Sequence, residues 1–179
     1  MKKIIFSIWV LLLPTLICAQ YLTGVATYYD DSFMEWRFFT EIEEEEGTLR
    51  LQWDNDWSEW DYRLNETFGT IKMKWKDKPG EWELRGNNKI ITARTIWTND
   101  FTEWRIQNGT QTFKLTSKWK NQFDVWSVTD NKHGDFAVET RWEGDPRDWN
   151  VFDDFSEEVD FETKMMMMFI VIFQSSPKQ

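Results

Sequence analysis

The chain has 179 residues, of which 41% are hydrophobic and 29% are charged, and its formal net charge is −10. This balance is typical of a single globular domain and excludes a disordered chain. The acidic surface argues against binding to nucleic acid or to anionic lipid headgroups, because both repel a negatively charged protein.

The first 19 residues have the pattern of a secretory signal peptide. Lys2 and Lys3 form a basic start, an apolar run covers residues 4–13, and Ala19 precedes the expected cleavage point. The run is too short for a membrane span, which needs about 20 apolar residues. We therefore expect a secreted or periplasmic protein with one mature domain, residues 20–179. Its net charge falls from −10 to −12 when the two lysines leave with the signal.

The single cysteine, Cys18, lies within the expected signal peptide. Lipid anchoring at this residue is the alternative to simple cleavage, although Ile17 is an unfavourable residue directly before a lipidated cysteine. If the signal is cleaved after Ala19, the mature domain has no cysteine and forms no disulfide.

A tandem repeat organises the rest of the chain. Two tryptophans lie seven residues apart in each unit, and the units follow one another about 22 residues apart. Tyr29 and Trp36 form an earlier copy at the same spacing, and residues 161–165 begin a degenerate last copy, which makes about seven units. The five complete tryptophan pairs are Trp53/Trp60, Trp75/Trp82, Trp97/Trp104, Trp119/Trp126 and Trp142/Trp149.

Each unit has the residue pattern of a β-hairpin. Residues 49–53 and 60–64 alternate between apolar and polar side chains, which is the period of a half-buried strand, and polar turn residues lie between them. Pairing of Trp53 with Trp60 would place both tryptophans of the unit on the core face. The same register in the next unit would place Lys74 opposite Glu83 on the polar face.

The hairpins predict an all-β fold, an antiparallel meander of about 13 strands. A sheet with one aromatic face cannot leave that face in water, so we expect it to close into a barrel or a flattened barrel. A sandwich and a solenoid of hairpins remain open alternatives. The repeat leaves about seven residues per strand, whereas a strand needs about 9–11 to cross a bilayer, so we expect no membrane-spanning barrel.

Close to the end of the sequence are nine consecutive apolar residues, Met165 to Phe173. This run is about half as long as a transmembrane helix needs to be. We interpret it as a last strand that is buried on both faces. The alternative is a segment that docks on a partner chain.

The spacing of the paired tryptophans is similar to that of choline-binding and glucan-binding cell-wall repeats, and the period is similar to that of MORN repeats. The cell-wall families use aromatic hairpins in a solenoid to hold ligands between units, which the resemblance implies as a possible mode of binding. Both families carry glycine and tyrosine at set positions, whereas this chain has 8 Gly and 4 Tyr in total. We carry over no binding residues from them.

The hairpin tips supply the candidate binding residues. Large aromatic side chains recur three positions before the second tryptophan, with aspartates close by, and such a rim can stack sugar rings and accept hydrogen bonds from their hydroxyls. The alternative is that these aromatic side chains fold back and close the end of the barrel. The candidate ligand-binding residues are Phe33, Trp57, Phe101, Phe123, Asp56 and Asp100.

Catalytic chemistry has little support in this composition. His133 is the only histidine and the mature domain has no cysteine, which argues against Ser-His-Asp and Cys-His catalysis. No calcium-loop motif is present, and we expect neither a metal nor another cofactor.

We therefore expect an exported, non-catalytic binding or structural protein, with carbohydrate as the favoured ligand class and a glycan or another exported protein as its partner. The alternative is an assembly protein that joins partner chains through sheet edges or the apolar C-terminal segment. A third reading is a glycan-active enzyme that uses two carboxylates.

Overall fold

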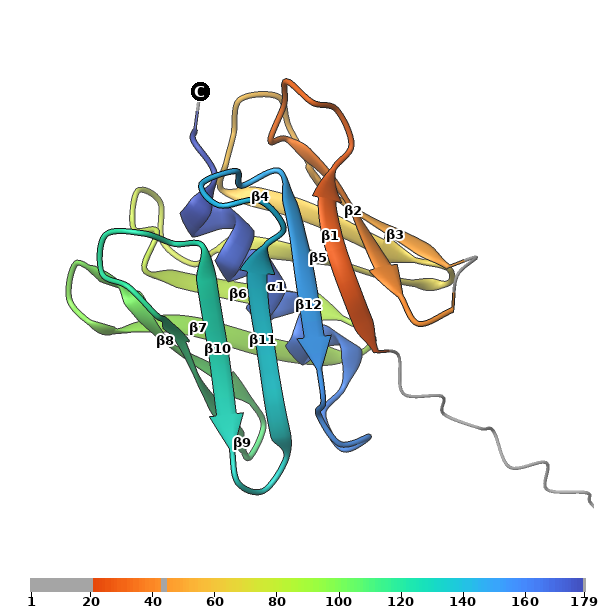
Figure 1. Cartoon of the computed structure of the whole chain (residues 1–179), viewed down its shortest axis with the longest axis vertical. Helices are drawn as coiled ribbons and strands as arrows, with labels where there is room; N and C mark the ends of the chain where they lie inside the picture. The colour runs from red at the N-terminus through yellow and green to blue at the C-terminus, as the bar shows by residue number, and fades with distance from the viewer. Residues whose placement is uncertain (1–20, 43–44, 179) are drawn as a thin grey trace, which may run out of the picture.

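Twelve antiparallel strands form a closed barrel around one helix (Figure 1). The computed structural model describes residues 21–42 and 45–178, so the signal peptide and its cleavage point lie outside the described residues. The strands are β1 (Leu22–Thr27), β2 (Glu35–Thr40), β3 (Glu46–Leu51), β4 (Glu59–Leu64), β5 (Thr67–Met73), β6 (Glu81–Gly86), β7 (Lys89–Trp97), β8 (Asp100–Asn108), β9 (Gln111–Ser117), β10 (Val125–Asp130), β11 (Gly134–Thr140) and β12 (Asp148–Asp153), and the helix is α1 (Phe161–Ser175).

Every strand pairs with its neighbours in the chain, and β1 pairs with β12 to close the sheet. Val25 on β1 lies opposite Trp149 on β12 at this junction. The predicted hairpin meander and its closure into a barrel are confirmed. Closure leaves no free sheet edge in the wall, which removes the unpaired backbone groups that an open sheet would expose.

The second tryptophan of each hairpin points into the barrel. Six such indoles are at most 2% exposed, and residues two positions further along each strand, such as Phe38 and Leu84, are buried with them. Side chains at the intervening positions face the solvent, as the strand period requires. Each buried indole removes roughly 150–250 Å² from water, so these residues are a main source of the barrel's stability. The six are Trp36, Trp60, Trp82, Trp104, Trp126 and Trp149.

The C-terminal run is an α-helix, not a strand, and this corrects the sequence interpretation. Residues 165–173 are at most 4% exposed, so the predicted burial on all sides is confirmed while the predicted element is wrong. Four consecutive methionines favour a helix because unbranched side chains lose little freedom there. A helix that is apolar all round must be buried, and a twelve-stranded barrel has room for one. The barrel therefore contains six hairpins, and the supposed seventh unit begins α1.

Polar contacts fix the helix inside the barrel. Asp160 caps its N-terminus by accepting a 2.9 Å hydrogen bond from the backbone N–H of Thr163. The Lys164 ammonium lies 2.8 Å from the carboxylate of Asp153, and both side chains are about 1% exposed. The backbone N–H of Leu22 donates to the same carboxylate. This buried cluster connects α1, β12 and the start of β1.

The first tryptophan of each pair lies outside the core, which corrects the predicted hairpin register. Leu51, not Trp53, pairs with Trp60, and Lys74 lies 3.7 Å from Glu81 instead of facing Glu83. The strands end two residues earlier than predicted, except for β7, which continues to Trp97 after a shift in register, and the chain turns directly after the first tryptophan. The backbone N–H of Asp56, for example, donates to the carbonyl of Trp53.

The residue two positions after the first tryptophan adopts a left-handed backbone in four of the hairpins. Such a conformation suits Asn, Asp and Gly, and it reverses the chain within a short connection. The four residues are Asn55, Asp77, Asn99 and Gly144.

Candidate functional site

Exposed aromatic residues encircle one end of the barrel. In an up-and-down barrel, the connections that follow odd-numbered strands all lie at the same end, and each of them carries or adjoins the first aromatic residue of its repeat (Figure 1). These side chains are 50–66% exposed. We call this set the aromatic crown: Tyr29, Trp53, Trp75, Trp97, Trp119 and Trp142.

The four aromatic residues predicted to bind ligand lie just inside the crown. Phe33, Trp57, Phe101 and Phe123 are half-buried and pack against the core. Their rings lie 5.6–6.2 Å from those of the buried tryptophans three positions later. Their backbone carbonyls also accept hydrogen bonds from the indole N–H groups of those tryptophans. They therefore cover the core at this end of the barrel.

The same indole–carbonyl hydrogen bond occurs in all six hairpins. In two of them a proline, Pro79 or Pro146, supplies the carbonyl at 2.8 Å. A buried indole N–H needs an acceptor, and here the backbone supplies it, so the indole needs no polar side chain as a partner. The residue three positions before the buried tryptophan therefore has a structural role: its backbone carbonyl accepts this hydrogen bond, and its side chain helps to cover the core.

The two predicted aspartates hold turns at the crown end. Asp56 accepts hydrogen bonds from the backbone N–H and hydroxyl of Ser58, at 3.0 and 2.5 Å. Asp100 does the same with Thr102, at 2.9 and 2.5 Å. These bonds stabilise the ionised carboxylates and lower the pKa of both Asp56 and Asp100.

Only some of the predicted residues come together in a concave site. Phe33 and Trp57 both line a cleft of about 810 Å³ between the β1–β2 and β3–β4 connections. Asp56 lies beside Trp57 in an adjoining hollow of about 530 Å³. Phe101, Phe123 and Asp100 belong to other connections and do not line the cleft.

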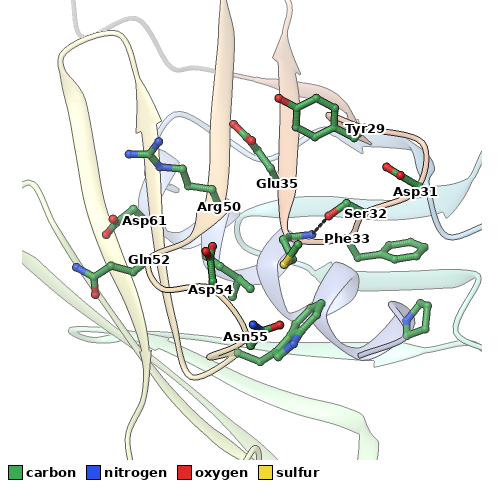
Figure 2. Close-up of a pocket in the computed structure, with 14 residues that line it drawn as sticks. Tyr29, Asp31, Ser32, Phe33, Glu35, Arg50, Gln52, Asp54, Asn55 and Asp61 are labelled. Atoms are coloured by element: carbon green, nitrogen blue, oxygen red, sulfur yellow. Dashed lines mark hydrogen bonds between the residues drawn. The ribbon is translucent and has the colours of Figure 1, made fainter. Parts of the chain in front are cut away.

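The cleft combines an aromatic wall with polar groups. Figure 2 shows Tyr29 and Asp31 on the β1–β2 connection, across the cleft from Arg50 near the end of β3 and from Gln52 and Asp54 on the β3–β4 connection. Carboxylates can accept hydrogen bonds from hydroxyl groups, and side-chain amides can both donate and accept them. An exposed ring offers a flat apolar face. The remaining lining residues are Ser32, Phe33, Met34, Glu35, Leu51, Asn55, Trp57, Asp61 and Pro177.

Acidic side chains hold two of the crown tryptophans in place. The indole N–H of Trp75 donates to Glu81 at 3.1 Å, and that of Trp97 donates to Glu103 at 2.9 Å. Lys114 also bonds to Glu103 at 2.6 Å, and these two donors lower the pKa of the Glu103 carboxyl, with the Lys114 bond contributing most. These two indoles are therefore exposed to solvent, but their hydrogen bonds fix their orientation.

The crown tryptophans were predicted to lie in the core, so sequence reasoning missed them as surface residues. A local signal was present: an Asn, Asp or Gly stands two residues after each of the five, where a left-handed turn can follow. A strand that continued past the first tryptophan would not have needed this residue type.

Residues 21–42 and 45–178 contain one histidine, His133, and no candidate metal cluster. No group of three or more His, Cys, Asp or Glu side chains there is placed to hold a metal ion. His133 is buried, with its ring 5.6 Å from that of Phe113, and Nδ1 lies 3.5 Å from Glu158.

Comparison with known proteins gives no relative for this chain. No family model matches it, and no curated protein or solved structure matches it either.

Within the described residues, no helix is long and apolar enough to cross a membrane.

Proposed function

We propose that this is an exported, non-catalytic carbohydrate-binding protein whose ligand lies across the aromatic crown. The observation that carries the proposal is the crown itself. All six hairpins keep a large aromatic residue at a position that the fold leaves at least half exposed. Burial in the core cannot account for that recurrence, and clustered exposed apolar groups mark interaction sites.

A sugar fits the chemistry that surrounds these rings. The apolar face of a pyranose ring is flat and stacks on an indole or phenol ring, while its hydroxyls need hydrogen-bond partners at the edge. Around the cleft, Tyr29 and Trp57 lie close to carboxylates and amides that include Asp31, Gln52 and Asn55. Eight of the fourteen lining residues are polar or charged and six are aromatic or apolar, a mixture that suits a ligand with many hydroxyl groups and flat apolar faces. We place the best-formed sugar subsite in this cleft.

This fold leaves few surfaces through which the protein could join partner chains, as the assembly alternative requires. The barrel wall is closed, and the apolar segment 165–173 lies inside it, so neither is available to join another chain. For the enzyme alternative, a general acid would need a raised carboxyl pKa. The described carboxyls with a clear pKa shift, such as Asp56 and Glu103, are all shifted downward. The closed wall and the buried segment favour a binding function over assembly.

The test is the binding of polysaccharides by a crown variant and a matched control. Trp53→Ala/Trp97→Ala removes two crown rings, whereas Phe68→Ala removes a 65% exposed aromatic ring at the opposite end of the barrel. Affinity electrophoresis in gels containing dextran, hydroxyethyl cellulose or carboxymethyl cellulose measures retardation of each protein. We expect retardation of the wild type and of Phe68→Ala, and its loss in the crown variant. Equal retardation of all three proteins would contradict the proposal.

A further inference from the structure

Three cationic side chains lie in one row on the outer wall. Arg94 on β7 is directly opposite Arg105 on β8, and Arg105 is directly opposite Lys114 on β9. All three face the solvent, because the residues beside them, such as Ala93 and Ile106, point inward. Side chains directly opposite each other start about 4.5–5.5 Å apart, and like charges at that spacing are destabilising. The row is therefore unfavourable for folding in a chain that is otherwise acidic.

Carboxylates close to the row already have cationic partners. Glu81 bonds to the indole of Trp75 and lies 3.7 Å from Lys74. The other two are Glu83, which pairs with Arg85 at 2.6 Å, and Glu103, which pairs with Lys114 at 2.6 Å. Within the described parts of the chain, neither Arg94 nor Arg105 makes an ion pair. Glu81 lies directly opposite Arg94 on β6, but it is held by Trp75 and Lys74, so neither guanidinium group forms an ion pair of its own.

A hollow of about 300 Å³ lies at these two arginines and adjoins the crown. Gly80, Glu81, Thr95 and Ile96 complete its lining. Trp97 lies three residues beyond Arg94 on the same strand. The hollow therefore continues the proposed sugar-binding surface down the wall of the barrel.

We propose that the ligand of the crown is an acidic glycan, with a carboxylate or sulfate group held between Arg94 and Arg105. The inference rests on the proposed function and names the class of ligand. A planar guanidinium donates two parallel hydrogen bonds to such an anion, and an anion between two arginines replaces their repulsion with two attractions. In the next row along the sheet, Thr92 lies opposite Gln107, and both can bond to the hydroxyls of the same sugar.

Part of the net negative charge of the protein lies at the other end of the barrel, too far away to act on this site. Glu66 is in the β4–β5 connection, and Glu157 and Glu158 follow β12, all at the end opposite the crown. Strands of six to nine residues separate the two ends by about 20–30 Å. Exposed charges are screened beyond about 8 Å at physiological ionic strength.

The experiment compares pairs of polysaccharides that share a backbone and differ in charge. Isothermal titration calorimetry gives the Kd for hydroxyethyl cellulose and carboxymethyl cellulose, and for dextran and dextran sulfate. We expect the charged member of at least one pair to bind at least tenfold more tightly, with an affinity that falls as salt is raised. The pair that shows the difference tells whether the acidic group is a carboxylate or a sulfate.

Variants separate a specific site from general charge attraction. Arg94→Gln/Arg105→Gln removes the paired arginines, and Arg63→Gln/Lys132→Gln removes two exposed cations elsewhere. We expect the first variant to lose at least tenfold in affinity for the acidic polysaccharide and nothing for its neutral partner, while the control variant is unchanged. Equal binding of both members of each pair, or an equal loss in both variants, would overturn the inference and leave the proposed function standing. Absence of binding to all four polysaccharides by folded protein would overturn both.

Discussion

The indole N–H of Trp104 donates a 2.9 Å hydrogen bond to the backbone carbonyl of Phe101, three residues earlier. Each of the other five hairpins has the equivalent hydrogen bond, so this bond is the structural signature of the repeat. It separates the two tryptophans of each pair by role. One is buried and bonded to its own turn, and the other, such as Trp97, stays on the surface.

Replacing a buried tryptophan is therefore expected to cost far more than replacing an exposed one. Trp104→Phe leaves a cavity and removes the donor for the Phe101 carbonyl, so we expect a loss of about 2–4 kcal/mol in the free energy of unfolding. Trp97→Phe should change it by less than about 0.5 kcal/mol. Urea unfolding followed by circular dichroism measures both. Similar losses in the two variants would contradict the division of roles.

The ion pair between Lys164 and Asp153 tests the placement of the helix inside the barrel. Lys164→Met removes the positive charge and leaves the Asp153 carboxylate buried, so we expect a loss of about 3–5 kcal/mol in the free energy of unfolding. Lys132→Met, at an exposed position, is the control. A loss below about 1 kcal/mol in Lys164→Met would mean that the pair is not buried.

Asp160 is expected to make stability depend on pH in the acidic range. Burial alone would raise the pKa of this carboxyl, but hydrogen bonds from Thr163 and Lys89 outweigh it and hold the pKa below its ordinary value of 3.8. Its contribution is therefore complete above that value and is lost as the pH falls through the lower pKa of the folded state. We expect Asp160→Asn to be less stable than the wild type by about 1–2 kcal/mol at pH 7, because Asn keeps the cap but not the ion pair with Lys89.

The difference between these two proteins should stay constant down to about pH 5 and shrink below pH 3.8. Thermal unfolding of both proteins at a series of pH values measures it. A difference that grows as the pH falls would have the wrong sign for a carboxyl with a lowered pKa.

Gly47 is predicted to be intolerant of any side chain. A Cβ atom at this position would lie 1.9 Å from Cζ of Phe38, whose ring lies over the glycine on the neighbouring strand. Because Phe38 is fully buried and cannot move aside without disturbing the core, we expect Gly47→Ala to lose about 1–3 kcal/mol in the free energy of unfolding. Gly47→Ala/Phe38→Leu should recover part of the loss, and no recovery would show that the clash is not the cause.

The sequence was sufficient to predict the antiparallel meander because the 22-residue repeat and the strand alternation both point to successive hairpins, whereas closure into a barrel was favoured over a sandwich or a solenoid without being decided. It did not distinguish the two tryptophans of a pair, since Trp142 and Trp149 are chemically identical and only the turn at Gly144 separates their environments. The run from Met165 to Phe173 was ambiguous for a related reason. A short apolar segment has no polar positions from which a period can be read, and only the barrel's interior decides that it is a helix.

The candidate site was harder to predict than the fold. Phe33 and Trp57 were predicted as ligand-binding residues from their positions along the chain, and both line one cleft, but the cleft itself depends on how two connections lie in space. The row of Arg94, Arg105 and Lys114 depends on the register between three strands, which spacing along one strand does not give.

The most direct test of the central claim is the intrinsic tryptophan fluorescence of the folded protein during titration with the four polysaccharides. The buried indoles are shielded from any ligand, so the exposed crown tryptophans and the half-buried Trp57 are the ones whose emission a bound sugar can change. We expect a saturable blue shift with at least one polysaccharide, and its loss in Trp53→Ala/Trp97→Ala. Unchanged emission with all four, from a protein that unfolds cooperatively, would contradict the assignment of the crown as a carbohydrate-binding surface.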